Sequence, residues 1–236
     1  MINILNKDCI EFLKGTEEKF DVVLTSPPYN NSRTNHTEYS MRTANCRYAE
    51  YDDNKTNEEY VAWTVQLFNL LDKVLVKNGT ILYNISYGNE NPTVMWEALF
   101  GIVNQTPFMI AENIVWKKSS AFPNNVSHNK LTRITEPVFV FCRKDEYNSY
   151  FMNKKVKSVS KTGQKFYENV FNYIEAPNND GSNELNNATY STGLCEKLLT
   201  LYCPKKRSCV RPIYGYWNDS CCLSETWNVL HRNGDI

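Results

Sequence analysis

The apolar run at residues 20–25 (FDVVLT) stops abruptly at Ser26-Pro27-Pro28-Tyr29, and this junction limits the fold more than any other part of the chain. A short run rich in β-branched residues is typical of a strand that is buried on both faces, as in a parallel sheet. Two consecutive prolines lack backbone N–H groups and have restricted φ angles. We therefore predict a buried strand that ends in a rigid turn at its carboxyl end, where α/β proteins place ligand chemistry.

Strand-like and helical patterns alternate along the rest of the chain. The further predicted strands are residues 1–5, 80–87, 111–118 and 137–144. The predicted helices lie around residues 9–13, from an N-cap at Asn57 to a C-cap at Asn78-Gly79, and over residues 93–104 and 192–202. This alternation predicts an α/β fold with a largely parallel sheet. The polar stretch 30–56 is either a loop that closes over a ligand or a solvated loop.

Composition narrows the functional class. The 236 residues suit one domain, and the formal net charge of zero gives no global polycation. Residues 117–165 nevertheless carry a local surplus of Lys and Arg, which favours contact with phosphates. The eight cysteines form no CxxC pair and no Cys/His ligand set, so we expect free thiols and no metal site. No signal peptide or membrane-spanning run is apparent, which predicts a cytoplasmic protein without a membrane partner.

The turn at residues 26–29 offers the chemistry that an exocyclic amine requires. The Ser26 hydroxyl and the Pro27 carbonyl can each accept an N–H bond. Such acceptors draw the amine nitrogen towards tetrahedral geometry, which frees its lone pair to attack an electrophilic methyl group. Tyr29 offers a flat ring on which a base that has been rotated out of a duplex can stack. We predict Ser26, Pro27, Pro28 and Tyr29 as the catalytic residues.

The motif TSPPYN (residues 25–30) resembles the catalytic motif of the amino-group DNA methyltransferases, which methylate cytosine N4 or adenine N6. The segments INILNKDCIEFL, VLVKNGTILYNIS, NIVWKKS, EPVFVFCRK and NNATYSTGLCEKLLTLYCP also resemble segments of this family. The resemblance implies a Rossmann-like S-adenosylmethionine-dependent fold in the permuted β-class order, with a small target-recognition insertion. It also implies S-adenosylmethionine as the methyl donor and double-stranded DNA as the partner.

The same resemblance implies further site residues and their roles. The cofactor-binding residues it implies are Asp8, Cys9, Thr25, Ala188 and Tyr190. The target-recognition elements it implies are residues 119–135 and 145–186, and the DNA-binding residues are Lys117, Lys118, His128, Lys130 and Arg133. An acidic residue such as Asp8 between a strand and a helix also has a purely structural explanation, because it can cap the helix.

A serine in place of the acidic residue common in adenine enzymes favours cytosine N4 over adenine N6. We expect a role in a restriction–modification system, a cognate restriction endonuclease as a partner, and a monomer or a homodimer. Two alternatives remain open. A non-catalytic DNA-binding remnant would keep the basic stretch without methyl transfer, and an RNA or small-molecule methyltransferase would share the core without needing that stretch.

Residues 207–236 depart from the family pattern, because the expected Asp-Pro-Phe-x-Gly-x-Gly-Thr-Thr cofactor turn is missing. A one-base shift of the back-translated sequence at residues 211–219 allows Asp-Pro-Phe-Met-Gly-Thr-Gly-Thr. Trp217 and Trp227 have one codon each, and both fall on glycines of the expected pattern. We predict a catalytic domain at residues 1–206 and an out-of-frame tail that lacks the cofactor loop and the last strands; a divergent natural tail is the alternative. The predicted consequences are weak or absent S-adenosylmethionine binding and aggregation.

Overall fold

The structure is a computed structural model that describes residues 2–30, 54–89, 91–121, 123–125, 127–178, 191–204, 208–213 and 226–231. The strands of its large sheet are β1 (Ile2–Asn6), β2 (Phe20–Thr25), β3 (Leu75–Asn84), β4 (Phe108–Lys117), β5 (Thr135–Arg143), β8 (Tyr173–Glu175), β9 (Ser208–Ile213) and β10 (Thr226–His231). The helices are α1 (Cys9–Gly15), α3 (Asn57–Val74), α4 (Val94–Gln105) and α5 (Thr192–Tyr202), with a 3₁₀ turn at Lys144–Glu146. A separate hairpin consists of β6 (Val156–Val159) and β7 (Lys165–Tyr167).

The described strands of the large sheet follow the order β1-β10-β9-β2-β3-β5-β4-β8. β2 is parallel to β3 and to β9, and β4 is parallel to β8. The other neighbours, β1–β10, β10–β9, β3–β5 and β4–β5, are antiparallel. The expectation of a largely parallel sheet is therefore wrong, because β5 returns directly beside β3 and β4 instead of crossing over through a helix. The α/β class itself is confirmed.

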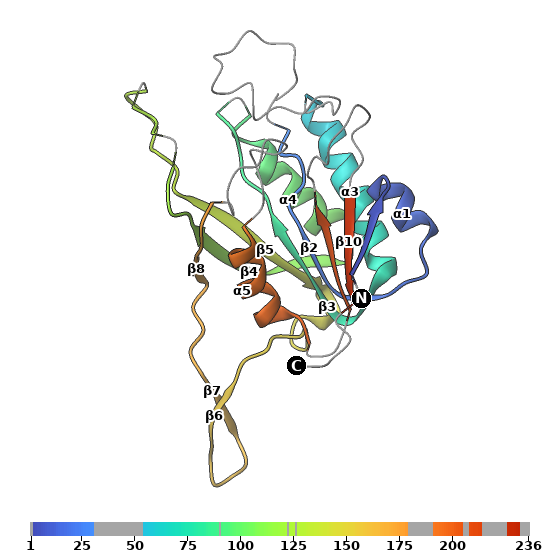
Figure 1. The fold of residues 1–236 in the computed structure, drawn as a ribbon, viewed down its shortest axis with the longest axis vertical. Coiled ribbons are helices and arrows are strands. Elements are labelled where there is room, and N and C mark those ends of the chain that lie inside the picture. Colours follow the sequence, from blue (N-terminus) through green and yellow to red (C-terminus); the bar gives the residue numbers. More distant parts are fainter. Residues whose placement is uncertain are drawn as a thin grey trace.

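Helices cover both faces of the sheet, so that the core has two halves (Figure 1). On one face α1, α3 and α4 pack against buried side chains such as Phe20, Ile81 and Phe141. On the other face α5 packs through Leu194 and Leu198 against the alternate residues of β2, β3 and β5. β2 is buried along its whole length, as the prediction of a strand covered on both faces requires.

The long helix α3 begins and ends at different residues from those predicted. Its N-cap is Thr56, whose hydroxyl accepts the Glu59 N–H at 3.2 Å, while the Glu59 carboxylate accepts the Thr56 N–H at 2.9 Å. This reciprocal pair is a capping box and places the N-cap one residue before Asn57. The helix ends at Val74, so Asn78-Gly79 is not its C-cap.

Asn78 and Gly79 instead bend the beginning of β3. Asn78 has a φ of 62°, a left-handed conformation that asparagine tolerates better than most residues. A Cβ on Gly79 would lie 2.9 Å from the Asp21 carbonyl oxygen, so that only glycine lets β3 approach β2 this closely. The register between β2 and β3 shifts at this point. Asn78 and Gly79, which were predicted to end a helix, therefore lie inside β3, where its pairing with β2 is irregular.

Arg143, at the end of β5, ties this strand to the carboxyl end of α3. Its guanidinium bonds the Asp72 carboxylate at 2.5 Å and donates to the Asp72, Leu75 and Val76 carbonyls at 2.8, 2.9 and 3.0 Å. The last carbonyls of a helix have no partners within the helix. One side chain thus satisfies one of them, on Asp72, together with the carbonyls of Leu75 and Val76 just after the helix, and binds a carboxylate as well.

The sheet does not lack its last strands, and this part of the prediction about the tail is wrong. β9 lies between β10 and β2, next to the strand that carries the Ser-Pro-Pro-Tyr turn. β10 joins β9 to β1. The backbone of the tail can therefore cover the edge of β2. The residue sequence that occupies these strands is still not that of a glycine-rich cofactor turn.

Two hairpin-like segments project from opposite ends of the sheet (Figure 1). The segment between β4 and β5, residues 118–134, leaves the end where β2 and β3 finish; we call it the recognition arm. The β6–β7 hairpin leaves the other end, where Phe151 N–H donates to the Asn78 carbonyl at 3.0 Å beside the start of β3. The predicted element 145–186 is therefore divided, and only its last part, β8 and the residues after it, returns to the end of the recognition arm.

The described residues contain no helix that is long and apolar enough to cross a membrane. Within the same ranges, no group of three or more His, Cys, Asp and Glu side chains is arranged to hold a metal ion. Cys9, Cys142 and Cys195 are buried free thiols, as expected. Cys203 is disulfide-bonded, and for this residue the expectation of a free thiol is wrong.

Candidate active site

The candidate site lies at the end of the sheet where the carboxyl ends of strands from distant parts of the sequence meet. We call this end the sheet edge. β1, β2, β3, β4 and β8 all run towards this edge, and antiparallel β5 begins there. The Ser-Pro-Pro-Tyr turn follows β2 directly, and Thr25 pairs with Tyr83 of β3. The ends of β2 and β3 are therefore adjacent, as α/β ligand sites require.

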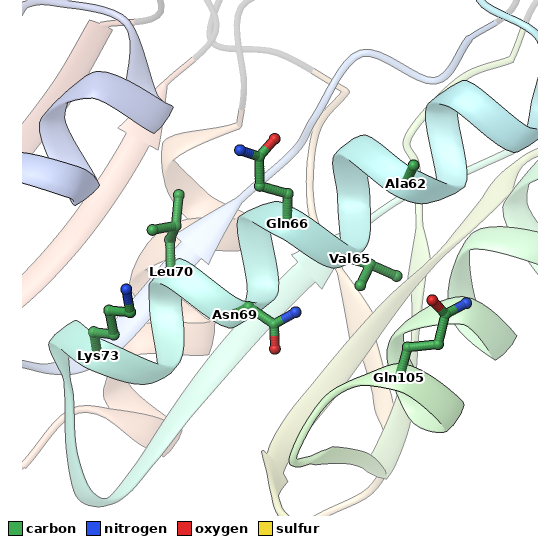
Figure 2. A pocket seen from close by; sticks show the side chains of 7 residues that line it. All are labelled: Ala62, Val65, Gln66, Asn69, Leu70, Lys73 and Gln105. Atoms are coloured by element: carbon green, nitrogen blue, oxygen red, sulfur yellow. The ribbon is translucent and has the colours of Figure 1, made fainter.

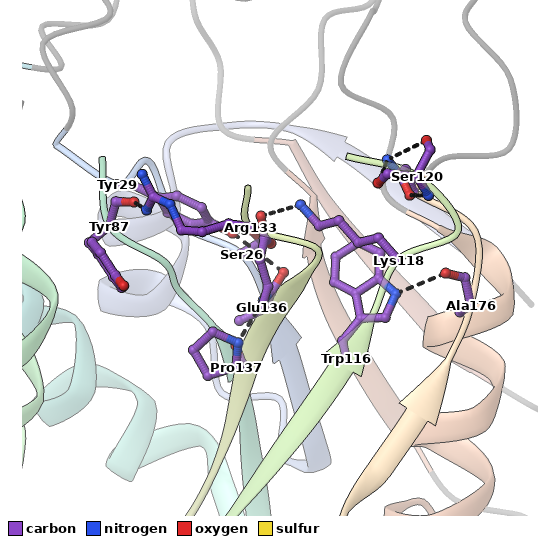
Figure 3. A network of polar contacts seen from close by, with 12 residues as sticks. Ser26, Tyr29, Tyr87, Trp116, Lys118, Ser120, Arg133, Glu136, Pro137 and Ala176 are labelled. Carbon is purple, nitrogen blue, oxygen red and sulfur yellow. Dashed lines mark hydrogen bonds and ion pairs between the residues drawn. The ribbon is translucent and has the colours of Figure 1, made fainter. Parts of the chain in front are cut away.

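A chain of hydrogen bonds connects the turn to the ends of β3 and β5 (Figure 3). Ser26 Oγ lies 3.0 Å from Tyr29 Oη, and Tyr29 Oη donates to Asn84 Oδ1 at 3.4 Å. Asn84 Nδ2 donates in turn to the Pro137 carbonyl at 2.9 Å. Asn84 is 1% exposed, whereas Ser26 and Tyr29 are half-buried. The turn is thus exposed enough to meet a ligand and is held from its buried side.

Two further contacts fix the backbone of the turn. Tyr60 of α3 donates its hydroxyl proton to the Pro28 carbonyl at 2.6 Å, in a fully buried position. The Asn30 side chain and the Lys55 backbone exchange two hydrogen bonds, of 2.8 and 2.9 Å. The carbonyl of Pro28 is therefore already used. Within the described residues no hydrogen bond reaches the carbonyl of Pro27, which leaves it as the second acceptor beside Ser26.

The residues that were predicted to bind the cofactor, and that the structure describes, lie in different environments. Asp8 is exposed and caps α1, because its Oδ1 accepts the Glu11 N–H at 2.9 Å. Its strand β1 runs parallel to β2, so this carboxylate stands at the same edge as Ser26. Cys9 and Thr25 are buried at 2% and 3% exposure. Ala188 and Tyr190 lie outside the described residues.

This donor set fits one part of S-adenosylmethionine. A carboxylate keeps acceptor capacity after capping a helix, and Asp8 can therefore accept from ribose hydroxyls or an adenine amine. The buried Thr25 packs the end of β2 below the turn. No described residue supplies the glycine-rich approach that the methionine part of such a cofactor requires, because the corresponding sequence is absent from residues 207–236.

Of the basic residues predicted to bind DNA, Lys117 and Lys118 are already paired within the protein. Lys117 forms an ion pair with Glu175 of β8, and this bond raises the pKa of Lys117 and lowers that of Glu175. Lys118 pairs with Glu136 and lies 5.1 Å from the centre of the Trp116 ring. These pairs join β4 to its neighbours, so neither lysine is a free cation.

Arg133 also has protein partners. Its guanidinium lies 4.6 Å from the Tyr87 ring centre and donates to the Tyr87 carbonyl, and to Asn89 Oδ1 at 2.9 Å. His128 and Lys130, in contrast, are exposed at the turn of the recognition arm. The structure thus separates the predicted DNA-binding residues into an exposed pair on the arm and three residues that hold the arm's base, of which Lys118 and Arg133 are drawn in Figure 3.

The groove shown in Figure 2 lies elsewhere in the molecule. It runs between α3 and α4 and is lined by Ala62, Val65, Gln66, Asn69, Leu70, Lys73 and Gln105. None of the motif residues lines it. The chemistry of the protein is therefore assigned to the sheet edge and not to this groove.

Sequence reasoning missed three residues that hold the site: Tyr60, Asn84 and Tyr87. One signal was present for Asn84, a polar residue directly after the apolar residues 81–83 of β3. Tyr60 followed the apolar period of its helix and carried no separate signal. Tyr87 gave none, because its role depends on an arginine far along the chain.

The fold is that of the Rossmann-like methyltransferase class, and comparisons with known proteins agree. A family model described as DNA methylase, of the N6 and N4 methyltransferases, matches residues 20–215. The chain therefore belongs to this family of amino-group DNA methyltransferases. Among curated proteins, none matches the chain.

Two solved structures share the fold. The PvuII DNA methyltransferase (cytosine-N4-specific) has a TM-score of 0.58 and 17% identity, and the match covers 85% of this chain and 70% of that one. The protein M1.HpyAVI has a TM-score of 0.53 and 16% identity, with coverages of 89% and 80%. At such low identity, these similarities concern the fold and not the target base.

Proposed function

We propose that this chain binds double-stranded DNA and holds a flipped base at Ser26, with cytosine N4 favoured over adenine N6 as the methyl acceptor. The observation that carries the proposal is the position of Ser26 and the Pro27 carbonyl at the end of β2, where the buried Tyr60 and Asn84 hold the turn. The base preference rests on Ser26, which stands in place of an acidic residue.

The proposed chemistry follows from the acceptors of the turn. Ser26 Oγ and the Pro27 carbonyl each accept one N–H of the exocyclic amine, and the nitrogen lone pair points away from the ring plane. Tyr29 carries the base on its ring. The nitrogen forms a bond to the methyl carbon, the carbon–sulfur bond of the donor breaks, and one amine proton leaves to water. S-adenosylmethionine supplies the electrophilic methyl group, and Asp8, Cys9 and Thr25, with Ala188 and Tyr190, are proposed to surround it.

We propose that the recognition arm meets the duplex. It leaves the same sheet edge as Ser26, and His128 and Lys130 are exposed on it. Lys117, Lys118 and Arg133 hold the arm's base through Glu175, Glu136 and Tyr87. In this proposal they contact DNA only if they exchange those partners for phosphates.

The proposed biological setting is a restriction–modification system, with a cognate endonuclease that recognises the same sequence. The protein acts as a monomer or a homodimer in this setting. The proposed domain boundary is the end of α5 and the residues that follow it, so that residues 1–206 form the catalytic domain and residues 207–236 the out-of-frame tail.

The sequence of the tail, residues 207–236, affects the methyl transfer that we expect from this chain. β9 and β10 complete the sheet, but the sequence in this part offers no Gly-x-Gly turn near the methyl donor. We therefore propose weak methyl transfer by this chain and strong transfer by a chain whose reading frame is restored after Lys205. The coding DNA tests the frame directly: codons that do not give Asp-Pro-Phe-Met-Gly in the neighbouring frame contradict it.

A methylation assay tests the function. The chain, its frame-restored form and the Ser26→Ala variant of each are incubated with duplex DNA and labelled S-adenosylmethionine, and the nucleosides are separated by mass. We expect N4-methylcytosine from the frame-restored form and its loss in Ser26→Ala. N6-methyladenine would overturn the base preference, and absence of any methylated base from both forms would overturn the proposed activity.

The tail also favours a second function, a DNA-binding remnant without catalysis. A gel-shift experiment beside the assay distinguishes the two. Salt-dependent duplex binding with no methyl transfer in either form supports the remnant. Transfer to RNA or to a free nucleoside, without duplex binding, would instead support a methyltransferase of another substrate class.

A further inference from the structure

We propose that Asn84 is a positioning residue that makes Ser26 a hydrogen-bond acceptor, and this inference rests on the proposed role of Ser26 at the base amine. A serine hydroxyl can either donate or accept. Only an accepting Ser26 Oγ can bind an amine N–H. Something in the fold must therefore direct the Ser26 proton elsewhere, and the hydrogen bonds at the sheet edge show which residue does so.

The first step is the orientation of the Asn84 amide. One end of this side chain lies 2.9 Å from the Pro137 carbonyl oxygen. A carbonyl only accepts, so the nitrogen of the amide has to face Pro137. The amide oxygen then faces Tyr29. Because Asn84 is 1% exposed, water does not compete for these positions.

The second step is the phenol of Tyr29. It has one proton, and the Asn84 oxygen can only accept it, across 3.4 Å. With its proton directed to Asn84, Tyr29 Oη meets Ser26 Oγ at 3.0 Å as an acceptor. Ser26 is then the donor of that bond, and its lone pairs remain for the incoming amine. The order of donation is Ser26 to Tyr29, Tyr29 to Asn84, and Asn84 to Pro137.

The backbone explains why this order is built into the fold. Asn84 is the last residue of β3, and it pairs with Val138, next to Pro137 at the beginning of β5. Pro137 has no N–H, so a side chain facing it meets only an acceptor at this place. The chain of bonds is therefore anchored in the sheet and not in a side chain that can rotate. Without it, Tyr29 is free to donate to Ser26 and occupy the position of the amine.

Neutron diffraction of the perdeuterated full-length chain tests the inference directly. We expect deuterium on Ser26 Oγ pointing to Tyr29 Oη, and the Tyr29 deuterium pointing to Asn84 Oδ1. A Tyr29 deuterium that points to Ser26 would overturn the proposal. This measurement does not require methyl transfer, so it stands or fails separately from the proposed function.

Kinetics give the second readout. The variants are Asn84→Leu, which removes both bonds, and Asn84→Asp, which keeps an acceptor for Tyr29. In the frame-restored form we expect Asn84→Leu to lower kcat for methyl transfer by about tenfold to a hundredfold, with little change in KM for DNA, and Asn84→Asp to restore part of it. Asn172→Leu removes an exposed amide bond of similar length, to the Asn113 carbonyl at 3.0 Å, and is the control that leaves kcat unchanged.

The two readouts distinguish the failures. Unchanged kcat in Asn84→Leu, together with a large loss in Ser26→Ala, would overturn the role of Asn84 and leave the proposed function intact. Equal losses in Asn84→Leu and in Asn172→Leu would show a structural effect and would also overturn it. The expected deuterium positions without methyl transfer by any form would support the hydrogen-bond order and contradict the proposed function.

Discussion

The Asn30 side chain and the Lys55 backbone form two hydrogen bonds with each other, from Asn30 Nδ2 to the Lys55 carbonyl at 2.8 Å and from the Lys55 N–H to Asn30 Oδ1 at 2.9 Å. Asn30 is 2% exposed and has a φ of 54°. The pair brings the end of the Ser-Pro-Pro-Tyr turn to the start of α3, so the geometry of the turn depends on a residue just outside the motif.

We expect Asn30→Ala to lower the free energy of unfolding by about 2–3 kcal/mol, because it removes two part-buried hydrogen bonds and because alanine tolerates a positive φ less well than asparagine. Asn30→Gly is the matched control. It loses the same bonds but tolerates the backbone, so its loss is smaller by roughly 1 kcal/mol. Urea denaturation measures both. Equal losses would mean that the backbone conformation contributes nothing.

Tyr83, unlike Asn30, has a buried polar group without a partner: its hydroxyl makes no hydrogen bond within the described residues. The side chains of Tyr60 and Thr64 lie near this hydroxyl without forming a hydrogen bond with it. Burying such a group without a partner is unfavourable. We expect Tyr83→Phe to leave stability unchanged or to raise it by about 1 kcal/mol, whereas Tyr60→Phe loses the bond to Pro28 and costs about 1–2 kcal/mol. Thermal unfolding of both variants side by side provides the comparison.

Burial also raises the pKa of Tyr83 and of Tyr202 above that of an ordinary tyrosine. Above pH 10 the unfolded chain loses these phenolic protons while the folded chain keeps them. The unfolded state then binds fewer protons, so the free energy of unfolding falls as the pH rises. We expect denaturation curves between pH 9 and 11 to show this fall, and a shallower one for Tyr83→Phe. Identical pH slopes for the two proteins would contradict the prediction.

Arg143 is expected to matter more for stability than any exposed ion pair. Its replacement by Met leaves the carbonyls of Asp72, Leu75 and Val76, and the largely buried Glu146, without their partner. We expect a loss of about 3 kcal/mol in the free energy of unfolding. Lys117→Met is the control, because its pair with Glu175 is exposed, and we expect no measurable change. Similar denaturation midpoints for both variants would refute this assignment.

DNA binding distinguishes the two projecting segments. Each phosphate contact contributes about one unit to the slope of log affinity against log salt. We expect Lys130→Ala, on the recognition arm, to reduce this slope by about 1. Lys161→Ala, in the exposed hairpin at the opposite end of the sheet, is expected to leave it unchanged. Fluorescence anisotropy with a labelled duplex measures the slopes, and the reverse outcome would place the DNA at the other end.

Local signals predicted some elements well. β2 and α5 have the predicted bounds, because one is a short β-branched run stopped by prolines and the other a regular apolar period after a serine cap. The end of α3 was predicted wrongly. Asn78-Gly79 is a strong local stop signal, but close approach between β3 and the Asp21 carbonyl uses these two residues inside a strand.

The mixed sheet and the position of β9 were also beyond local reasoning. Strand order depends on which apolar faces meet, and no short pattern states it. The basic residues illustrate the same limit. Their number between residues 117 and 165 was evident, but the partners that Glu136, Glu175 and Tyr87 provide became visible only when the strands were placed side by side.

The sequence by itself determined the Ser-Pro-Pro-Tyr motif, the family and the strand on which the motif stands, because these depend on residues that are neighbours in the chain. The tertiary structure decided how the motif is held. Tyr29 and Asn84 are 55 positions apart, and Asn84 and Pro137 a further 53. Hydrogen bonds have a range of about 3 Å, so only the order and register of β2, β3 and β5 could bring these groups together.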